Sequence, residues 1–389
     1  MKLSNLISYT SAIASYAIAR IIVLFSPIKH KKFFCLSMNG NSYGDNVKCI
    51  ADYICDHTSN VEIVWAFSKF FYEKIKCREK CVKLFTIKYY YHILTSKYIL
   101  TNCSFGPLHI LRKRKAQVCV NMWHGTALKR IGIDIFSTKE KSLLYKYFNF
   151  NYVTYTSKIT DYFVSGSSYM TEIIKSKLLF QKEILEIGTP RNDIFFQKRE
   201  DVSFKIRNLY NIQKGKRIIL YAPTFRDDDS ISVYDVNLQM IKNELSKKFG
   251  VDYQLLIKLH PTLIKKTNMF SKLFADSTDV SLYPDMQDLL YSSDVLITDY
   301  SSSMFDFMYS NKLVILYVND KEKYNRGFYM NIEELPFIIL NYNAEIRSKI
   351  DGFRMATYEE KIQLFLTKIG SVETGDATKK LYEILCHNV

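Results

Sequence analysis

Short apolar runs, typical of buried strands, alternate with helix-length segments along almost the whole chain. Parallel strands joined by crossover helices give this pattern, because each strand is covered on both faces and needs no polar alternation. Six runs come before Arg199: Phe33–Met38, Val61–Phe67, Tyr98–Cys103, Gln117–Trp123, Tyr162–Ser167 and Ile184–Gly188. Five follow it: Arg217–Phe225, Tyr253–His260, Val280–Tyr283, Asp294–Tyr300 and Leu313–Val318. The sequence therefore predicts an α/β protein with two Rossmann-like, doubly wound domains that face a cleft.

The boundary between the two domains is expected within residues 188–204, GTPRNDIFFQKREDVSF, where glycine, proline and charged residues follow one another. We predict a first domain over residues 29–195 and a second domain over residues 196–389. The C-terminal helical segments, Tyr358–Ile369 and Lys379–Leu385, either close the second domain or cross back to the first.

Residues 1–28 are predicted to form a separate apolar helix. From Leu3 to Phe25 the apolar residues fall at helical spacing along one stripe, and serines and Arg20 interrupt the other side. Pro27 ends the helix, and a basic cluster follows it, Lys29, His30, Lys31 and Lys32. The stretch is marginal for a membrane span, and a signal peptide would carry its basic residues in front. We predict a helix that lies on an anionic membrane surface, with a core-packed first helix as the alternative.

Composition narrows the range of partners. The chain has 54 Lys and Arg residues against 39 Asp and Glu, a formal net charge of +15, which favours phosphate-bearing substrates, acidic membranes or nucleic acid. Its eight cysteines are scattered singly without zinc-ligand spacing, so we expect free thiols. Neither a GxGxxG loop nor a GxxxxGKS/T loop is present, which argues against a dinucleotide-dependent oxidoreductase and a P-loop ATPase.

The strongest local signal for a binding site is Asp294–Asn311, DVLITDYSSSMFDFMYSN, where a strand runs into three serines and then a helix. Ser301 and Ser302 bring hydroxyl groups and backbone N–H donors to the start of that helix, which suits a phosphate or pyrophosphate. Asp306 lies about one turn into the helix and can accept hydrogen bonds from ribose hydroxyls. In the alternative interpretation the serines are ordinary helix caps and Asp306 is a surface charge.

Other strand ends in the second half also carry polar groups. His260, in KLHP, can donate a hydrogen bond to a phosphate oxygen or protonate a leaving group. Thr224 and Arg226 lie in YAPTFRDDD, and the planar fork of an arginine suits phosphate or carboxylate. Arg326, in RGFYM, is expected to make a further anion contact.

A strand-end histidine also occurs in the first half, within NMWHGTALKRIGID (121–134). His124 follows the strand Gln117–Trp123, and Gly125 permits close approach of another group to the backbone. The predicted cleft thus has strand-end histidines in both halves and an anion-binding loop in the second. For His124 taken alone, a histidine that is only hydrogen-bonded within a turn is the alternative.

Six motifs, in the same order, resemble those of the CDP-glycerol glycerophosphotransferase family, enzymes that prime and polymerise wall teichoic acid or build phosphate-linked capsules. They are WHGTALKRIGID (123–134), GTPRND (188–193), YAPTFRDD (221–228), KLHP (258–261), DLLYSSDVLITDYSSSMFDF (288–307) and RGFY (326–329). The opening stretch SMNGNSYGDNVKCIADYI (37–54) is also similar, so the resemblance covers nearly the whole chain. It implies two Rossmann-like domains of the GT-B type, a peripheral position at the cytoplasmic face of the cell membrane, and a CDP-activated polyol as donor.

The resemblance implies catalytic roles for two histidines. His124 matches the essential histidine of the family's WHG motif and is expected to be the general base. His260 matches the histidine of the family's HP motif and is expected to act on the phosphates.

The other matching residues are expected to bind the donor. Those of the family's CDP-binding DYSSxxFD segment are Ser301, Ser302 and Asp306. The phosphates are expected near Thr224 and Arg226, with Arg191 and Arg326 as further anion contacts. Two departures from the family pattern, Ala127 in place of proline and LPFI in place of LPGP at Leu335–Ile338, affect none of these residues.

Together these features predict a phosphotransferase. It moves glycerol phosphate, or a related polyol phosphate, from CDP-glycerol or another CDP-polyol to a lipid-linked saccharide or polyol-phosphate acceptor and releases CMP. No metal site or cofactor is expected, apart from a divalent cation that the substrate pyrophosphate can carry. A GT-B sugar-nucleotide glycosyltransferase and a non-enzymatic basic protein that binds membrane or nucleic acid are the alternatives, although no nucleic-acid-binding module is recognisable. Glycerol and ribitol, priming and polymerisation, and teichoic acid and capsule all fit these motifs.

Overall fold

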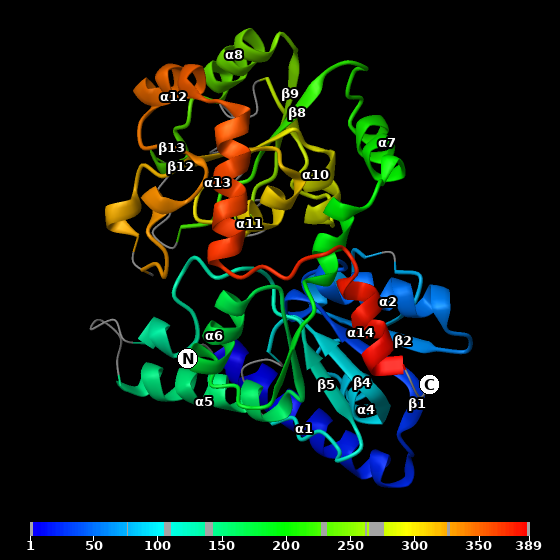
Figure 1. The fold of residues 1–389 in the computed structure, drawn as a ribbon. Coiled ribbons are helices and arrows are strands. Elements are labelled where there is room, and N and C mark those ends of the chain that lie inside the picture. The colour runs from blue at the N-terminus through cyan, green and yellow to red at the C-terminus, as the bar shows by residue number, and fades with distance from the viewer. Residues whose placement is uncertain are drawn as a thin grey trace. The chain divides into compact units, whose positions relative to one another are not determined.

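A computed structural model describes residues 3–75, 77–104, 110–136, 143–226, 232–260, 263, 276–324 and 327–386. The chain forms two compact units. Unit 1 comprises Met1–His124, Ile131–Asp193 and Val372–Val389, and unit 2 comprises Gly125–Arg130 and Ile194–Ser371. Each unit is built on a parallel β-sheet against which helices pack, as Figure 1 shows.

Unit 1 contains a seven-stranded sheet in the order β3-β2-β1-β4-β5-β6-β7. Its strands are β1 (Lys29–Leu36), β2 (Glu62–Phe67), β3 (Lys80–Lys83), β4 (Ser96–Thr101), β5 (Val118–Asn121), β6 (Tyr162–Ser165) and β7 (Glu183–Glu186). Its helices are α1 (Leu3–Ile22), α2 (Asp45–His57), α3 (Lys69–Tyr72), α4 (Ile87–Thr95), α5 (Leu143–Ile159), α6 (Ser168–Lys177) and α14 (Ala377–Cys386). The order reverses between β1 and β4, and doubly wound sheets bind ligands beyond the carboxyl ends of the strands at such a switch point.

Side chains of β1 alternate between the two faces of this sheet. Phe33 and Cys35 pack in one core cluster with residues of α2 and α14, whereas Phe34 and Leu36 pack in another with residues of α1 and α4. The alternation follows from the two-residue repeat of a strand. Because helices cover both faces, the inner strands are apolar throughout, which explains why apolar runs predict them.

Unit 2 contains a six-stranded sheet in the order β10-β9-β8-β11-β12-β13. Its strands are β8 (Arg217–Tyr221), β9 (Tyr253–Ile257), β10 (Thr278–Asp279), β11 (Val295–Thr298), β12 (Leu313–Tyr317) and β13 (Ile338–Leu340). Its helices are α7 (Glu200–Leu209), α8 (Leu238–Phe249), α10 (Met286–Ser292), α11 (Ser303–Phe307), α12 (Ile346–Gly352) and α13 (Met355–Lys368). Counted from β8 this is the Rossmann strand order, with its switch point between β8 and β11. Two parallel α/β domains are therefore confirmed.

Most of the predicted strands are present with slightly different bounds. The prediction of a strand over Val280–Tyr283 is wrong: β10 ends at Asp279, and the chain then turns, with the Tyr283 N–H bonded to the Val280 carbonyl at 3.0 Å. The sequence does not predict β3 and β13, because both are short edge strands with little pattern to detect.

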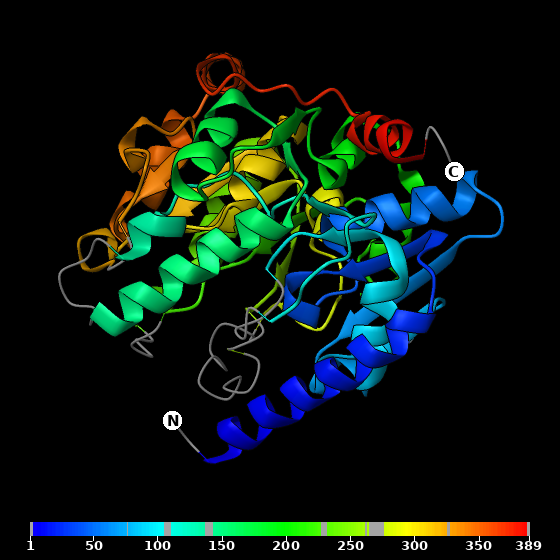
Figure 2. The same ribbon diagram turned by 90° about the horizontal axis from the view of Figure 1, so that it is seen from below.

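The C-terminal helix belongs to unit 1, so the prediction that the second domain continues to residue 389 is wrong. Helix α14 lies beside α2 in both Figure 1 and Figure 2, and it buries Leu381 and Leu385 in the core of unit 1. The hydroxyl of Tyr98 also donates to the Leu385 carbonyl at 2.6 Å. Helix α13 stays in unit 2, and the division after Asp193 lies close to the predicted boundary.

Helix α1 is part of unit 1 rather than a separate element. Ala19 and Val23 join the core cluster that contains α4, and Tyr16 packs edge-on against Tyr90 with ring centroids 5.2 Å apart. The predicted apolar stripe faces outward, with exposures of 42–63% at Ile13, Ile18, Ile21 and Ile22. A core-packed side and an exposed apolar side therefore coexist on one helix. Among the described helices, none combines the length and apolarity needed to cross a bilayer.

Candidate active site

His124 lies on a strained turn directly after β5. Trp123 before it has a φ of +50° and Gly125 after it a φ of +128°, both in the left-handed region that side chains disfavour. The half-buried ring places Nδ1 2.8 Å from the carbonyl oxygen of Asn102. Because a carbonyl oxygen can only accept, Nδ1 carries a proton, and Nε2 is the nitrogen that accepts a proton when the ring is neutral. His124 therefore has the tautomer and fixed orientation that a general base needs.

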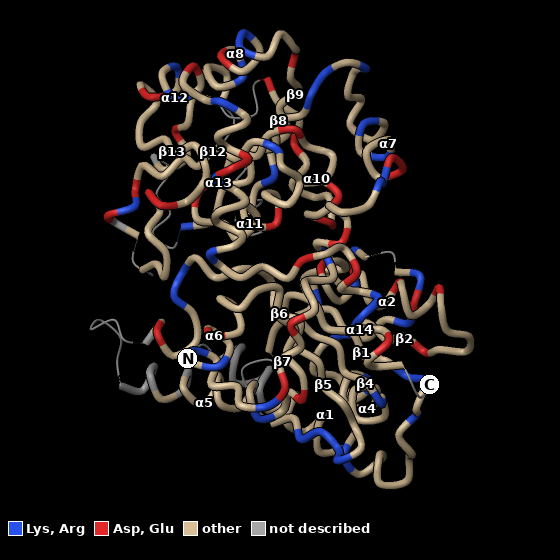
Figure 3. The backbone as a smooth tube through the Cα atoms, viewed as in Figure 1, with Lys and Arg blue, Asp and Glu red and all other residues tan. Residues whose placement is uncertain are grey.

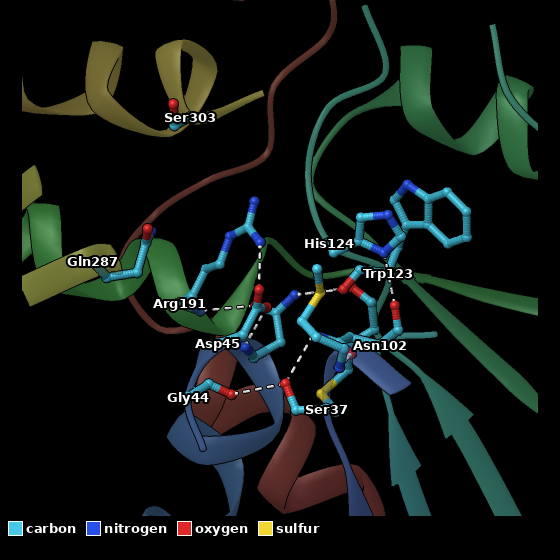
Figure 4. A network of polar contacts seen from close by, with 12 residues as sticks. Ser37, Gly44, Asp45, Asn102, Trp123, His124, Arg191, Gln287 and Ser303 are labelled. Carbon is cyan, nitrogen blue, oxygen red and sulfur yellow. Dashed lines mark hydrogen bonds and ion pairs between the residues drawn. The ribbon is translucent and has the colours of Figure 1, made fainter. Parts of the chain in front are cut away.

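Asn102 is itself held at the switch point of the unit 1 sheet. Its Oδ1 accepts from the Met38 N–H at 2.9 Å, and its Nδ2 donates to Ser37 Oγ at 3.3 Å. Ser37 follows β1 and Asn102 follows β4, the two strands between which the strand order reverses. Figure 4 shows Ser37, Asn102 and His124 in one network of polar contacts. The His124 ring stacks on the Trp123 indole with centroids 4.3 Å apart.

The chain passes into unit 2 immediately after His124 and returns to unit 1 at Ile131. Within unit 2 this short segment pairs with residues 327–329: the Tyr329 N–H donates to the Leu128 carbonyl at 2.8 Å, and the Arg130 N–H donates to the Gly327 carbonyl at 3.1 Å. A Cβ at Gly327, where φ is +65°, would lie 3.2 Å from the Arg130 side chain, so glycine suits this approach. His124 is thus one peptide bond away from a segment of unit 2.

The segment between β11 and α11, which contains Ser301 and Ser302 and is called the serine loop, lies at the switch point of the unit 2 sheet. Ser301 and Ser302 are half-buried, and Ser301 Oγ accepts from the Ser303 N–H at 3.3 Å and the Ser303 hydroxyl at 2.8 Å. Helix α11 has only five residues, so anion binding here would depend on hydroxyl and N–H donors more than on a helix dipole. Asp306 is 4% exposed, so the alternative of a surface charge is wrong for this residue.

Arg226 lies in a buried ion-pair cluster and is 7% exposed. Its Nε bonds Asp320 Oδ2 at 2.6 Å, and its Nη1 lies 2.9 Å from Asp299 Oδ2. Thr224 joins the cluster, donating its N–H and hydroxyl to Asp299 at 3.0 and 2.9 Å. The structure thus shows Arg226 binding two carboxylates, and a direct contact with phosphate stays a prediction. The immediate effect of the cluster is to hold the loop after β8 against the loop after β11.

His260 follows β9 at the same edge of the unit 2 sheet and remains accessible to solvent. Partial burial of the ring lowers the pKa of His260, and the positive charge of Lys129 lowers that pKa further. The ring is therefore neutral at pH 7, where it can donate one hydrogen bond. Lys258 in the same motif is structural, since its Nζ donates to the Tyr283 carbonyl at 2.7 Å.

The remaining predicted anion contacts differ in their placement. Arg191 is only 6% exposed, and its Nη1 bonds Asp45 Oδ2 at 2.9 Å, so it forms an internal ion pair of unit 1. Arg326 lies outside the described residues. Within the described ranges, no group of three or more His, Cys, Asp or Glu side chains is placed to hold a metal ion.

Several residues around the site were not assigned a role from sequence. Asp299 and Asp320 bind Arg226, Asn102 orients His124, and Lys129 acts on the pKa of His260. The sequence contains a local signal for Asp299, because an acidic residue directly after a buried strand is a candidate site residue. It contains no such signal for Asp320 and Asn102, whose partners lie 94 and 22 residues away in the chain.

Comparison with known proteins agrees with this arrangement. Residues 18–387 match the family described as CDP-Glycerol:Poly(glycerophosphate) glycerophosphotransferase. The chain is 32% identical over 369 residues to a teichoic acid poly(glycerol phosphate) polymerase of Staphylococcus epidermidis, covering 92% of this chain but 51% of that protein. It is 30% identical to the protein of the same description from Bacillus spizizenii, covering 99% of this chain and 100% of that one.

A solved structure agrees as well. A variant of the wall teichoic acid polymerase TagF, solved with CDPG, superimposes with a TM-score of 0.82 at 28% identity, covering 100% of this chain and 98% of that one. The resemblance seen in the motifs is therefore confirmed over nearly the whole chain. With the matching motifs placed at the carboxyl ends of both sheets, the chain belongs to the CDP-glycerol:poly(glycerophosphate) glycerophosphotransferase family.

Proposed function

We propose that the protein transfers glycerol phosphate from CDP-glycerol to a hydroxyl group of a membrane-linked acceptor and releases CMP. Family membership supports the reaction class. The observation that carries the proposal is the orientation of His124, whose Nδ1 donates to the Asn102 carbonyl at 2.8 Å. That hydrogen bond leaves Nε2 as the basic nitrogen, which is the requirement for deprotonating an acceptor hydroxyl.

Unit 2 is proposed to bind the donor. Hydroxyl and N–H groups of Ser301 and Ser302 suit the pyrophosphate, and the buried carboxylate of Asp306 suits the ribose hydroxyls. His260 can donate a hydrogen bond to a phosphate oxygen from its neutral ring. Thr224 and Arg226 bind Asp299, two residues before Ser301, and so support the serine loop indirectly.

The reaction proceeds by direct displacement at the phosphorus that carries glycerol. His124 Nε2 accepts the proton of the acceptor hydroxyl as the oxygen attacks this phosphorus. A new phosphate ester bond forms, and the bond from the same phosphorus to the oxygen bridging to CMP breaks. Hydrogen-bond donors of the serine loop and His260 stabilise the charge on the departing CMP.

The same proposal assigns the protein a peripheral place at the cytoplasmic face of the cell membrane, where lipid-linked acceptors lie. The outward side of α1 continues into Leu24 and Phe25, which are 73% and 88% exposed. Figure 3 shows Lys and Arg near α1. In the sequence, Lys29 and Lys31 follow shortly after the helix. Exposed apolar residues beside basic residues suit an anionic lipid surface. The proposal also assigns the two Rossmann-like units to the GT-B type.

The test is transfer of radiolabelled glycerol phosphate from CDP-glycerol to a lipid-linked acceptor. His124→Ala should lower the rate on the order of 10²–10⁴-fold while binding of CDP remains, because only the general base is lost. His57→Ala, which removes an exposed histidine at the C-terminal end of α2, is the matched control and should retain full activity. Retained transfer by His124→Ala would contradict the assigned base. Turnover of a sugar nucleotide in place of CDP-glycerol would identify a glycosyltransferase instead.

A further inference from the structure

The side chain of Asn46 joins three separate segments of unit 1. Asn46 is fully buried, at 0% exposure, in the first turn of α2. Its Nδ2 donates to the carbonyl oxygens of Met122 and Trp123, both at 3.0 Å, and its Oδ1 accepts from the Arg191 N–H at 3.0 Å. We propose that Asn46 is a positioning residue for His124, holding the backbone turn that presents the imidazole. This proposal rests on the catalytic role proposed for His124.

The turn needs such support because its backbone is unfavourable. A left-handed conformation such as that of Trp123, with φ of +50°, costs roughly 1–2 kcal/mol for a residue with a side chain. The Trp123 N–H donates to Asn121 Oδ1 at 3.0 Å, and the Trp123 carbonyl accepts from Asn46. Both backbone polar groups of Trp123, the residue before His124, are therefore fixed by the buried amide side chains of Asn121 and Asn46, and the surrounding structure maintains the strain.

The chemistry at position 46 requires an amide. Two neighbouring carbonyl oxygens need a donor, and the Arg191 N–H needs an acceptor, so one planar group must supply both. A carboxylate of the same shape would set a negative oxygen against the carbonyls of Met122 and Trp123. An alanine would leave these buried groups without that partner.

Asn46 also links the GTPRND motif (188–193) to the turn that carries His124. Arg191 donates its N–H to Asn46 and its Nη1 to Asp45, and these contacts fix the start of α2 against the motif. Figure 4 shows Asp45 and Arg191 in the same contact network as Trp123 and His124. A chain of contacts therefore runs from Arg191 through Asn46 to the turn, and this structural role accounts for the burial of Arg191.

The test is Asn46→Asp, which preserves shape and removes the donor. We expect kcat for glycerol phosphate transfer to fall on the order of 10–100-fold through misplacement of the base, with the KM for CDP-glycerol and the binding of CDP unchanged. In protein labelled with ¹⁵N-histidine, His124 of the unaltered enzyme should show the Nδ1–H tautomer, and the variant should show a mixture. Asn208→Asp, on the exposed side of α7, is the control and should match the unaltered enzyme in every measurement.

The outcomes separate this proposal from the proposed function. If His124→Ala is inactive while Asn46→Asp keeps its kcat and its tautomer, the positioning role is wrong and the base assignment stands. If His124→Ala remains active, the base assignment itself is wrong. Should Asn46→Asp fail to fold, Asn46→Ser takes its place, because a single hydroxyl cannot replace the amide contacts to both carbonyls and to the Arg191 N–H. An unchanged kcat in a folded Asn46→Ser variant would overturn the positioning role.

Discussion

The guanidinium of Arg226 lies between two carboxylates and two aromatic rings. The centroids of the Tyr300 and Tyr324 rings are 4.9 and 5.2 Å from its central carbon. Burial alone would lower the pKa of Arg226, but the hydrogen bond to Asp320 and the charges of Asp299 and Asp320 raise it, so the group stays charged. A buried charge of this kind is tolerated only while its partners remain.

Asp320→Asn should therefore destabilise unit 2 strongly. Removing one carboxylate from a buried arginine costs on the order of 3 kcal/mol, measured as the change in unfolding free energy by chemical denaturation. Asp201→Asn is a matched control, since Asp201 also binds an arginine, Arg199, with two contacts of 3.0 and 2.9 Å, but on the surface. The control should leave stability almost unchanged. Equal effects of the two substitutions would contradict the structural role given to the Arg226 cluster.

At the scale of elements, helix α4 and strand β1 meet through a buried polar group. Lys32, at 0% exposure, places its Nζ 2.8 Å from His92 Nδ1 and 2.8 Å from Thr95 Oγ1. Burial lowers the pKa of His92 to about 4, and the charge of Lys32 contributes to the shift. The folded protein therefore keeps His92 neutral in a range where the unfolded chain, with an ordinary value near 6.5, binds a proton.

This difference predicts a loss of stability in acid. As pH falls from about 6.5 to about 4, the unfolded state gains a proton that the folded state does not, so the unfolding free energy should drop by about 3 kcal/mol in total from this group. Denaturation curves at pH 7 and pH 4.5 measure the effect. His92→Gln should show a smaller drop over the same range, because it has no proton to gain. An equal drop in both proteins would show that His92 is not its source.

At the scale of the whole molecule, the exposed apolar side of α1 should direct the protein to anionic lipid vesicles. Replacing Ile21 and Phe25 with aspartate removes two side chains that are 63% and 88% exposed, so folding should be unaffected. Each large apolar side chain that enters lipid contributes about 1.5–3 kcal/mol, so vesicle binding should fall more than about 10-fold in a flotation assay. Leu364→Asp, at a position 71% exposed on α13, is the control. Unchanged binding by the double variant would assign the membrane contact to another surface.

Apolar runs and helix-length spacing are properties of local chain segments, so the two parallel sheets and most strand ends were predictable from the amino-acid sequence. It also placed His124, His260 and the serine loop after strands, and parallel topology then brings such residues to one edge of each sheet. The tertiary structure alone decided that α14 returns to unit 1, since that depends on which core offers a complementary apolar surface.

The partners of the polar groups likewise depend on how distant segments pack, and the sequence did not predict them. Arg226, whose predicted contact with phosphate stays a prediction, binds Asp320, 94 residues further along the chain. The tautomer of His124 follows from a carbonyl 22 residues earlier, and the support of its turn follows from Asn46. Hydrogen bonds and ion pairs of this kind join residues that are distant in sequence. The sequence therefore shows which side chains can form such contacts, but it does not show which of them pair with one another.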